Sequence, residues 1–453
     1  MRPVVTTEEY RRVDRAYTGD LGAAMDRAGH AVAGVAARHG VGYGNRVAVL
    51  AGPGNNGGYG YVAARYLAAR GAAVTVHSLA PPNTREARAA AAKAGGVMVV
   101  PLDGVTDADI VVDALFGGGV RGGLPNEVLD WMHTDTPVIA VDFPTGLDPD
   151  TGGVEERAFQ ATETVTFSTL KTGHVLKSGP DHCGNVTVVD IGINGGHPSL
   201  YLAEETDAPR PARKRTAHKW SAGSVLIVGG STGMVGAAIL AGRSALKFGA
   251  GTVVVASPQL DLVQRAAPEL LAYTLDRALE SLDRFDVVVA GPGLADSDSG
   301  PVRDLVAKAG RVVLDAGGLT PLTLEAANQG EAEVVVTPHD AEFARLAGVD
   351  AGVFSIRSYA MRSGVTVLRK GSPTMVTDGD LPVLVTSGGP ELASIGTGDV
   401  LSGMLGALWA RGLDPTGAAI SAAYWHGVAG ASLAERQAVT ADALADHISS
   451  YAW

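Results

Sequence analysis

A glycine-rich segment that leads into an apolar helix carries the clearest candidate chemistry in this chain of 453 residues. The segment Ala393–Gly403 reads ASIGTGDVLSG, with Gly396 and Gly398 on either side of Thr397 and Asp399 at the expected helix start. Glycines allow a tight turn, and a helix start adds unpaired N–H groups and a positive dipole end. Such a turn can bind a phosphate, and Asp399 could take a proton from a hydroxyl group there. The alternative is that Thr397 and Asp399 only cap the helix.

Further polar groups follow the strands expected in the second half of the chain, at residues 224–229, 252–257, 287–290, 311–314, 333–337 and 365–368. The segment GPGL begins at Gly291, DAGGLT begins at Asp315, and PHDAEF holds His339 and Glu342. RKGSPT follows the last of these strands and holds Lys370. Each group alone is a weak signal, so the order in which they occur along the chain matters more.

That order resembles the ribokinase-like superfamily, and more closely the dehydratase half of the NAD(P)H-hydrate repair enzymes. The resemblance rests on residues 218–251, on GPGL, on TPHDAEFARL from Thr337, on LRKGSPTMV from Leu368 and on GTGDVLSG from Gly396. It implies a substrate, the S epimer of NADH or NADPH hydrated at C6 of the nicotinamide ring, and the removal of water at the expense of ADP or ATP with Mg²⁺. Phosphorylation would turn the C6 hydroxyl into a good leaving group, with Asp399 as the base.

The same resemblance implies two sets of binding residues. The nucleotide would be bound by Lys370, Gly371, Ser372, Pro373, Thr374 and Gly398. The hydrated dinucleotide would be bound by Ala237, Gly293, His339 and Asp399.

In the first half, three expected strands at residues 46–51, 110–114 and 137–143 end in polar, glycine-rich segments. GPGNNGGYG supplies Asn55 and Asn56, DALFGGGVRGG begins with Asp113, and DFPTGLD supplies Asp142 and Thr145. These oxygen groups suit a hard cation, and their few carboxylates favour a monovalent ion over Ca²⁺. The alternative is that the asparagines fill turn positions and the aspartates cap helices.

These segments resemble the NAD(P)H-hydrate epimerase domain. The resemblance implies K⁺ held by Asn56, Asp113 and Thr145, with Asp142 as the acid/base group. The hydrated dinucleotide would be bound by Asn55, Asn56, Gly57, Gly58, Tyr59, Gly117, Gly118, Gly119, Val120, Arg121, Gly122, Gly123 and Asp142. Tyr59 stands where the family motif NNGGDG has aspartate. This departure leaves an alternative open: a ribokinase-like small-molecule kinase with a degenerate, non-catalytic N-terminal binding domain.

The repeated strand–helix alternation predicts an α/β protein of two domains. Residues 1–207 would form a Rossmann-like three-layer sandwich and residues 208–453 a ribokinase-like domain, with a polar linker at residues 202–217. Helices are expected within residues 6–40 and over 61–70, with a glycine-rich turn at 52–60. The sole cysteine, Cys183, is either a reactive thiol or a packing residue.

Composition excludes some partners and leaves others open. The net charge of −12 gives no support for nucleic-acid binding, and no uninterrupted apolar stretch is long enough for a membrane span. A single cysteine allows a reducing compartment, so a cytoplasmic location is expected. The family resemblance suggests a homo-oligomer.

Overall fold

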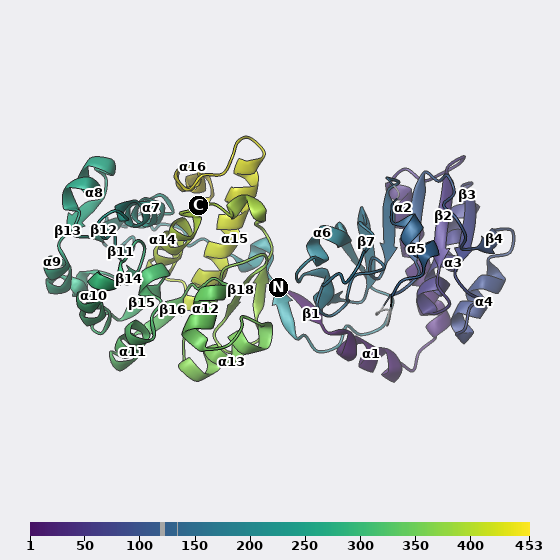
Figure 1. Cartoon of the computed structure of the whole chain (residues 1–453), viewed down its shortest axis with the longest axis horizontal. Helices are drawn as coiled ribbons and strands as arrows, with labels where there is room; N and C mark the ends of the chain where they lie inside the picture. Colours follow the sequence, from purple (N-terminus) through teal and green to yellow (C-terminus); the bar gives the residue numbers. More distant parts are fainter. Residues whose placement is uncertain (118–122, 134) are drawn as a thin grey trace. The chain divides into compact units, whose positions relative to one another are not determined.

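The computed structural model describes residues 1–117, 123–133 and 135–453. The chain divides into two compact units (Figure 1). The N-terminal unit is Pro3–Ser199, and the C-terminal unit is Met1–Arg2 with Leu200–Trp453. Both units alternate strands and helices, so the predicted α/β class is confirmed. The domain boundary between residues 207 and 208 stays a prediction.

Among its described residues, the N-terminal unit is built on a parallel sheet with the order β4-β3-β2-β5-β6-β7-β9. The strands are β2 (Arg46–Ala51), β3 (Ala73–Ser78), β4 (Met98–Pro101), β5 (Ile110–Ala114), β6 (Val138–Val141), β7 (Glu163–Phe167) and β9 (Asn185–Val189). A short parallel pair, β1 (Arg2–Val5) with β8 (Leu170–Lys171), pairs Val4 with Leu170. The helices are α1 (Thr7–Ala16), α2 (Leu21–Arg38), α3 (Asn55–Ala69), α4 (Arg85–Lys93), α5 (Asn126–Trp131) and α6 (Gly179–Cys183).

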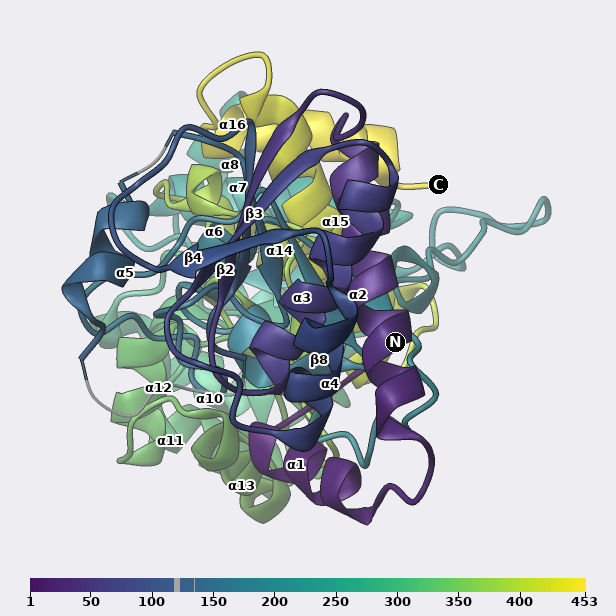
Figure 2. The ribbon, with the colours of Figure 1, turned by 90° about the vertical axis from the view of Figure 1, so that its right-hand side faces the viewer.

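Helices cover both faces of this sheet because alternate residues of a strand point to opposite sides. Val47 and Val49 of β2 share an apolar cluster with α2 and α3, whereas Ala48 and Leu50 pack with Trp131 of α5. Figure 2 shows α2, α3 and α4 on one side of β2–β4 and α5 on the other. This is the three-layer, doubly wound arrangement that was predicted.

The turn after β2 is shorter than predicted, because α3 begins at Asn55 rather than at Tyr61. Tight packing explains the glycines inside this helix. A Cβ at Gly57 would lie 1.8 Å from the carbonyl oxygen of Gly52, and one at Gly58 would lie 2.6 Å from the Met25 side chain. These glycines therefore allow the first turn of α3 to approach the neighbouring backbone and α2 closely.

The C-terminal unit has the sheet order β13-β12-β11-β14-β15-β16-β17-β18-β19-β10. Strands β13 to β17 of that order run parallel, and β18 is antiparallel to both of its neighbours. The strands are β10 (Leu200–Leu202), β11 (Ser224–Val228), β12 (Thr252–Ala256), β13 (Leu271–Tyr273), β14 (Val287–Ala290), β15 (Arg311–Leu314), β16 (Glu333–Val336), β17 (Thr366–Arg369), β18 (Thr374–Thr377) and β19 (Val383–Val385).

An apolar core joins this sheet to helices α7, α8, α14, α15 and α16. The helices are α7 (Val235–Lys247), α8 (Leu260–Ala266), α9 (Leu275–Glu280), α10 (Ser299–Val306), α11 (Pro321–Gln329), α12 (Asp340–Ala347), α13 (Val353–Ser363), α14 (Thr397–Ala410), α15 (Pro415–Ala434) and α16 (Ala441–His447). Helix α14 crosses α7 so closely that a Cβ at Gly403 would lie 2.1 Å from the carbonyl oxygen of Ala241. This crossing fixes the start of α14 against α7.

The linker prediction for residues 202–217 is wrong, because this segment packs on the C-terminal unit. The indole N–H of Trp425 donates to the carbonyl oxygen of Ala208 at 2.8 Å. The Arg210 guanidinium lies 3.8 Å from the centre of the Trp425 ring. The polar composition that suggested a linker thus includes a cation that stacks on an aromatic ring.

Two further expectations concern the reactivity of Cys183 and the presence of a membrane-spanning helix. Cys183 is fully buried and burial raises the pKa of its thiol to about 12, so it is a packing residue rather than a reactive thiol. In the part of the chain that the structure describes, no helix is both long and apolar enough to cross a membrane.

Candidate active sites

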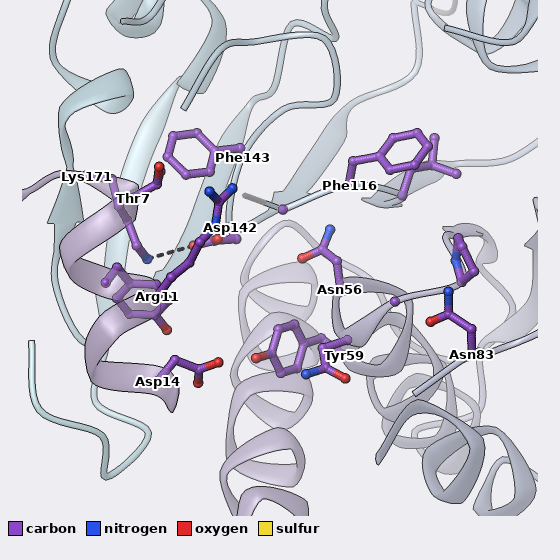
Figure 3. Close-up of a pocket in the computed structure, with 16 residues that line it drawn as sticks. Thr7, Arg11, Asp14, Asn56, Tyr59, Asn83, Phe116, Asp142, Phe143 and Lys171 are labelled. Atoms are coloured by element: carbon purple, nitrogen blue, oxygen red, sulfur yellow. Dashed lines mark hydrogen bonds and ion pairs between the residues drawn. The ribbon is translucent and has the colours of Figure 1, made fainter. Parts of the chain in front are cut away.

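A cavity of about 390 Å³ lies at the carboxyl edge of the N-terminal sheet (Figure 3). Several elements meet there. The loops after β5 and β6 supply Phe116 and Asp142, the N-terminal part of α3 supplies Asn56 and Tyr59, and β8 supplies Lys171. Helix α1 closes another wall of the cavity. The polar segments that follow β5 and β6 thus converge on one cavity.

Asp142 is held in an unusual conformation beside a buried lysine. Its φ of 67° is in the left-handed region, which is uncommon for a residue other than glycine. Its Oδ1 accepts hydrogen bonds from Lys171 Nζ and Thr166 Oγ1, each at 2.8 Å. Burial alone would raise the pKa of Asp142, but the Lys171 ammonium outweighs it, and the pKa is lowered. Asp142 is therefore a carboxylate held in one orientation, which suits proton transfer.

The backbone of Asp142 is fixed as well. His174 Nε2 donates to the carbonyl oxygen of Asp142 at 2.7 Å, and His174 Nδ1 accepts from the backbone N–H of Lys171 at 3.1 Å. Burial, the largest cause, lowers the pKa of His174 to about 4, so the ring is neutral. It thus links the two charged residues through their backbones.

Lys171 was missed by the sequence analysis, although a signal for it existed. It follows β7, a fourth strand that ends at the same edge of the sheet, within the segment TLKTGH. Its side chain is 1% exposed, and its ammonium also donates to Thr166 Oγ1 at 2.7 Å. A lysine buried this deeply needs a carboxylate partner, and Asp142 supplies it.

The predicted cation ligands come from neighbouring elements. Asp113 is fully buried and accepts hydrogen bonds from Thr145, at 2.7 Å from the backbone N–H and 2.8 Å from Oγ1. Burial raises the pKa of Asp113 to about 6, although the hydrogen bonds from Thr145 oppose this shift. Asn56 is 8% exposed, and within the described residues neither its amide oxygen nor its amide nitrogen has a hydrogen-bond partner. An unpaired amide oxygen and a buried carboxylate fit a cation.

Some of the predicted substrate-binding residues of this unit line the cavity and others do not. Gly57 and Gly58 are buried in the first turn of α3, and Gly123 is not among the residues that line the cavity. Gly118, Gly119, Val120, Arg121 and Gly122 lie outside the described residues. Those that line the cavity are Asn55, Asn56, Tyr59, Gly117 and Asp142.

In the C-terminal unit, the turn before α14 has the predicted shape. Gly396 adopts a left-handed φ of 88°, and no side chain of the described chain caps the helix. Thr397 Oγ1 instead donates backwards to the carbonyl oxygens of Leu392 and Ser394, each at 2.8 Å. The capping alternative is therefore wrong for Thr397 and Asp399. The Thr397 N–H donates to the carbonyl oxygen of Ser394 at 3.4 Å, whereas the N–H groups of Gly398 and Asp399 have no partner among the described residues and are available for an oxyanion.

Asp399 lies near a group of charged side chains from the ends of β15 and β17 and from α12. Lys370 Nζ lies 2.8 Å from Asp315 Oδ1 and 3.6 Å from Glu342 Oε2. Burial, followed by the charge of Asp315, raises the pKa of Asp399 to about 7, although Lys370 opposes this shift. A carboxyl group whose pKa is near neutrality is suited to act as a general base.

A cavity of about 260 Å³ joins most of the predicted nucleotide-binding residues. Lys370, Gly371, Ser372 and Thr374 line it together with Gly398, whereas Pro373 is not among its lining residues. His426 lines the same cavity and its Nε2 donates to the carbonyl oxygen of Thr397 at 2.9 Å. The structure thus brings the segment after β17 to the start of α14.

The remaining predicted substrate residues lie on two elements. A Cβ at Gly293 would lie 3.1 Å from the Cβ of Ala237, so these two residues are neighbours. Leu240 lies one turn after Ala237 on α7. A Cβ at Gly396 would lie 2.9 Å from the Leu240 side chain, so this part of α7 lies beside the turn before α14. His339 is exposed and caps α12 in a reciprocal arrangement with Glu342, whose Oε2 accepts from the His339 N–H at 2.9 Å.

Comparisons with known proteins agree with both sites. The family model for the YjeF-related protein N-terminus matches residues 22–173, and that for NAD(P)H-hydrate dehydratase matches residues 225–452. A bifunctional NAD(P)H-hydrate repair enzyme from Hyperthermus butylicus is 36% identical, covering 90% of this chain and 83% of that protein. One from Mycobacterium tuberculosis is also 36% identical, covering 84% and 82%. This chain belongs to the family of bifunctional NAD(P)H-hydrate repair enzymes.

Solved structures place the C-terminal unit of this repair-family member in the ribokinase-like fold. The ADP/ATP-dependent NAD(P)H-hydrate dehydratase of Bacillus subtilis, co-crystallised with ATP and Mg²⁺, is 28% identical with a TM-score of 0.50. The similarity covers 56% of this chain and 98% of that one. A ribokinase-like protein from Enterococcus faecalis, 22% identical with a TM-score of 0.50 over 56% and 95% of the two chains, shows the same fold. Because the curated relatives match across both units, a small-molecule kinase with a degenerate N-terminal domain is not favoured.

Proposed function

We propose that the C-terminal unit dehydrates the S epimer of hydrated NADH or NADPH, with ADP or ATP as the phosphoryl donor. The observation that carries this proposal is Asp399, a carboxyl group with its pKa near neutrality beside an uncapped helix start. Asp399 would take the proton of the C6 hydroxyl while its oxygen attacks the terminal phosphoryl group. The N–H groups of Gly396–Gly398 and the Lys370 ammonium would hold the phosphoryl oxygens. The ring nitrogen would then expel phosphate, and loss of a proton from C5 would restore the reduced ring.

The residues around Lys370 fit a nucleotide-bound Mg²⁺. Mg²⁺ is usually held by one or two carboxylates together with substrate phosphates, not by an all-protein cage. In the described residues no three His, Cys, Asp or Glu side chains form such a cage. Burial lowers the pKa of the Lys370 ammonium, but the nearby carboxylates of Asp315, Glu342 and Asp399 outweigh this effect, so the pKa is raised. Glu342 and Asp315 would contribute to holding the ion, which would offset the charge of the nucleotide phosphates.

For the N-terminal unit, we propose that it interconverts the R and S epimers of the same hydrates. Asp142, oriented by Lys171, would transfer the proton at the C6 oxygen. K⁺ would be held by Asn56, Asp113 and Thr145, where it would pair the orphan amide oxygen and balance the buried carboxylate. A cytoplasmic location and a homo-oligomer stay predictions.

Product stoichiometry distinguishes this function from that of a kinase. With the S hydrate of NADH and ADP, each molecule of restored NADH should accompany one AMP and one inorganic phosphate. Chromatography of the nucleotides together with a phosphate assay measures both products. A stable phosphorylated dinucleotide without free phosphate would identify a kinase and contradict the dehydratase proposal.

The dehydration rate should follow the ionisation of Asp399. Because the raised pKa of about 7 leaves this base protonated in acid, kcat/KM should fall about tenfold per pH unit below that value. A pH–rate profile at saturating nucleotide measures this dependence. A profile that stays flat down to the ordinary aspartate value of 3.8 would contradict the role of Asp399 as a base.

Epimerisation should depend on K⁺ through Asn56. Replacing K⁺ by choline should slow the conversion of R to S about tenfold, and Asn56→Ala should remove the response to K⁺. The initial rate of epimer conversion, measured by chromatography at constant ionic strength, tests this. An equal response to K⁺ in wild type and Asn56→Ala would show that Asn56 is not a ligand.

A further inference from the structure

Helix α1 presents a set of side chains to the N-terminal cavity that the mechanism above does not use. Thr7, Tyr10, Arg11 and Asp14 line the cavity, and their spacing of i, i+3, i+4 and i+7 places them on one helix face. The helix is fixed to its own unit at two points of this face, Thr7 and Tyr10. The Thr7 N–H donates to Asp150 Oδ1 at 2.7 Å, and the Tyr10 ring lies 4.1 Å from the Lys171 ammonium.

Asp14 points into this cavity from α1. In Figure 3 its carboxyl group and the hydroxyl of Tyr59 are directed toward one another across the lower part of the cavity. Asp142, by contrast, comes from the sheet edge, where Lys171 holds it. Two carboxyl groups from different walls of one cavity are thus available to the same ligand.

We propose that Asp14 is a second catalytic carboxyl group of the N-terminal site, acting as the acid where Asp142 acts as the base. This inference rests on the epimerase function proposed above. Protonated Asp14 would give its proton to the C6 hydroxyl oxygen, the C6–O bond would break, and water would leave with the bonding electrons. The ring nitrogen lone pair would form a C6–nitrogen double bond. Water would then add to the other face of C6 and give a proton to Asp142. Loss of that proton from Asp142 to solvent and uptake of one by Asp14 would restore both groups, so that atoms and electrons balance.

The environments of the two groups suit these roles. Burial, followed by the negative charge of Asp142, raises the pKa of Asp14, whereas the pKa of Asp142 is lowered. Paired carboxyl groups whose surroundings separate their pKa values divide into an acid and a base. The charged and titratable side chains that line the cavity with Asp14 are Tyr10 and Arg11 of α1, Tyr59 of α3, Asp142 and Lys171.

Asp14→Asn in the full chain tests the proposal. It should lower kcat for R-to-S conversion about 100-fold with little change in KM, and Asp14→Glu should recover part of the rate. In wild type, the rate should fall as the pH rises through the raised pKa of Asp14, and this decline should be absent in Asp14→Asn. Glu8→Gln removes a charge from the exposed side of the same helix and should leave both rate and profile unchanged. Dehydration of the S hydrate should be equal in all variants, because it takes place in the C-terminal unit, and denaturant unfolding verifies that the N-terminal unit of each variant is folded.

Two results would overturn the proposal. Asp14→Asn with a rate within about threefold of wild type and the same pH profile would exclude Asp14 while leaving the epimerase proposal in place. A wild-type protein that does not accelerate the conversion of R to S would reject the epimerase function and Asp14's role with it.

Discussion

Asp399→Asn should abolish the recovery of NADH from its S hydrate, with kcat lowered at least about 10³-fold. Asparagine has the size of aspartate but cannot accept the proton of the C6 hydroxyl. The reaction should fail at phosphoryl transfer, so no AMP should form either. The absorbance of the reduced nicotinamide checks this result, together with the yield of AMP when ADP is the donor and of ADP when ATP is the donor.

Binding must be measured alongside this loss of activity. Because Asp399 is not among the residues that line the cavity of Lys370, Gly371, Ser372, Thr374 and Gly398, ADP should bind to Asp399→Asn within about threefold of wild type in titration calorimetry. Asp261→Asn is a matched control, since this aspartate is exposed on α8. Near-full dehydration by Asp399→Asn would assign the base to another residue.

Asp142→Asn should have the largest effect on epimerisation, lowering the rate by about 10²- to 10⁴-fold. Asparagine tolerates the left-handed backbone that residue 142 adopts, so the loop should keep its shape. The Lys171 ammonium would lose its carboxylate partner in a buried position. The free energy of unfolding should therefore fall by about 3–5 kcal/mol in the N-terminal unit. Chromatography of the epimers and denaturant unfolding measure the two effects.

A double variant separates these effects. Asp142→Asn with Lys171→Met removes the unpaired buried charge and should recover much of the lost stability, because methionine fills a similar volume without a charge. It should not recover epimerisation, since no proton-accepting group returns. Recovery of the rate together with the stability would mean that Asp142 acts only on folding.

The sequence was most informative where a functional residue follows an apolar strand. Asp113, Asp142 and Lys370 each stand at or just after the end of a buried strand, and parallel neighbours bring such positions to one edge. The start of α14 was equally visible as a glycine-rich segment before an apolar run. Both sites were therefore approximately located without the structure.

Other features depend on tertiary packing that local sequence does not encode. Asp14 lies on a helix with charged residues on several sides, and only the position of α1 decides which side meets the cavity. Lys171 is the last residue of the two-residue strand β8, which is too short for a periodic pattern to reveal. The early start of α3 at Asn55 depends on how closely glycine lets the helix approach Gly52.

The central claim, that one chain repairs both epimers of a hydrated dinucleotide, is tested most directly with a mixture of R and S hydrated NADH and excess ADP or ATP. The wild-type protein should restore the full reduced-nicotinamide absorbance in one fast phase. Asp142→Asn should restore at that rate only the fraction of the absorbance that corresponds to the S hydrate. The remainder should follow at the rate of uncatalysed epimerisation of R to S. Failure of the wild-type protein to restore absorbance with either nucleotide would contradict the dehydratase, and a wild-type fast phase that stops at the S share would contradict the epimerase.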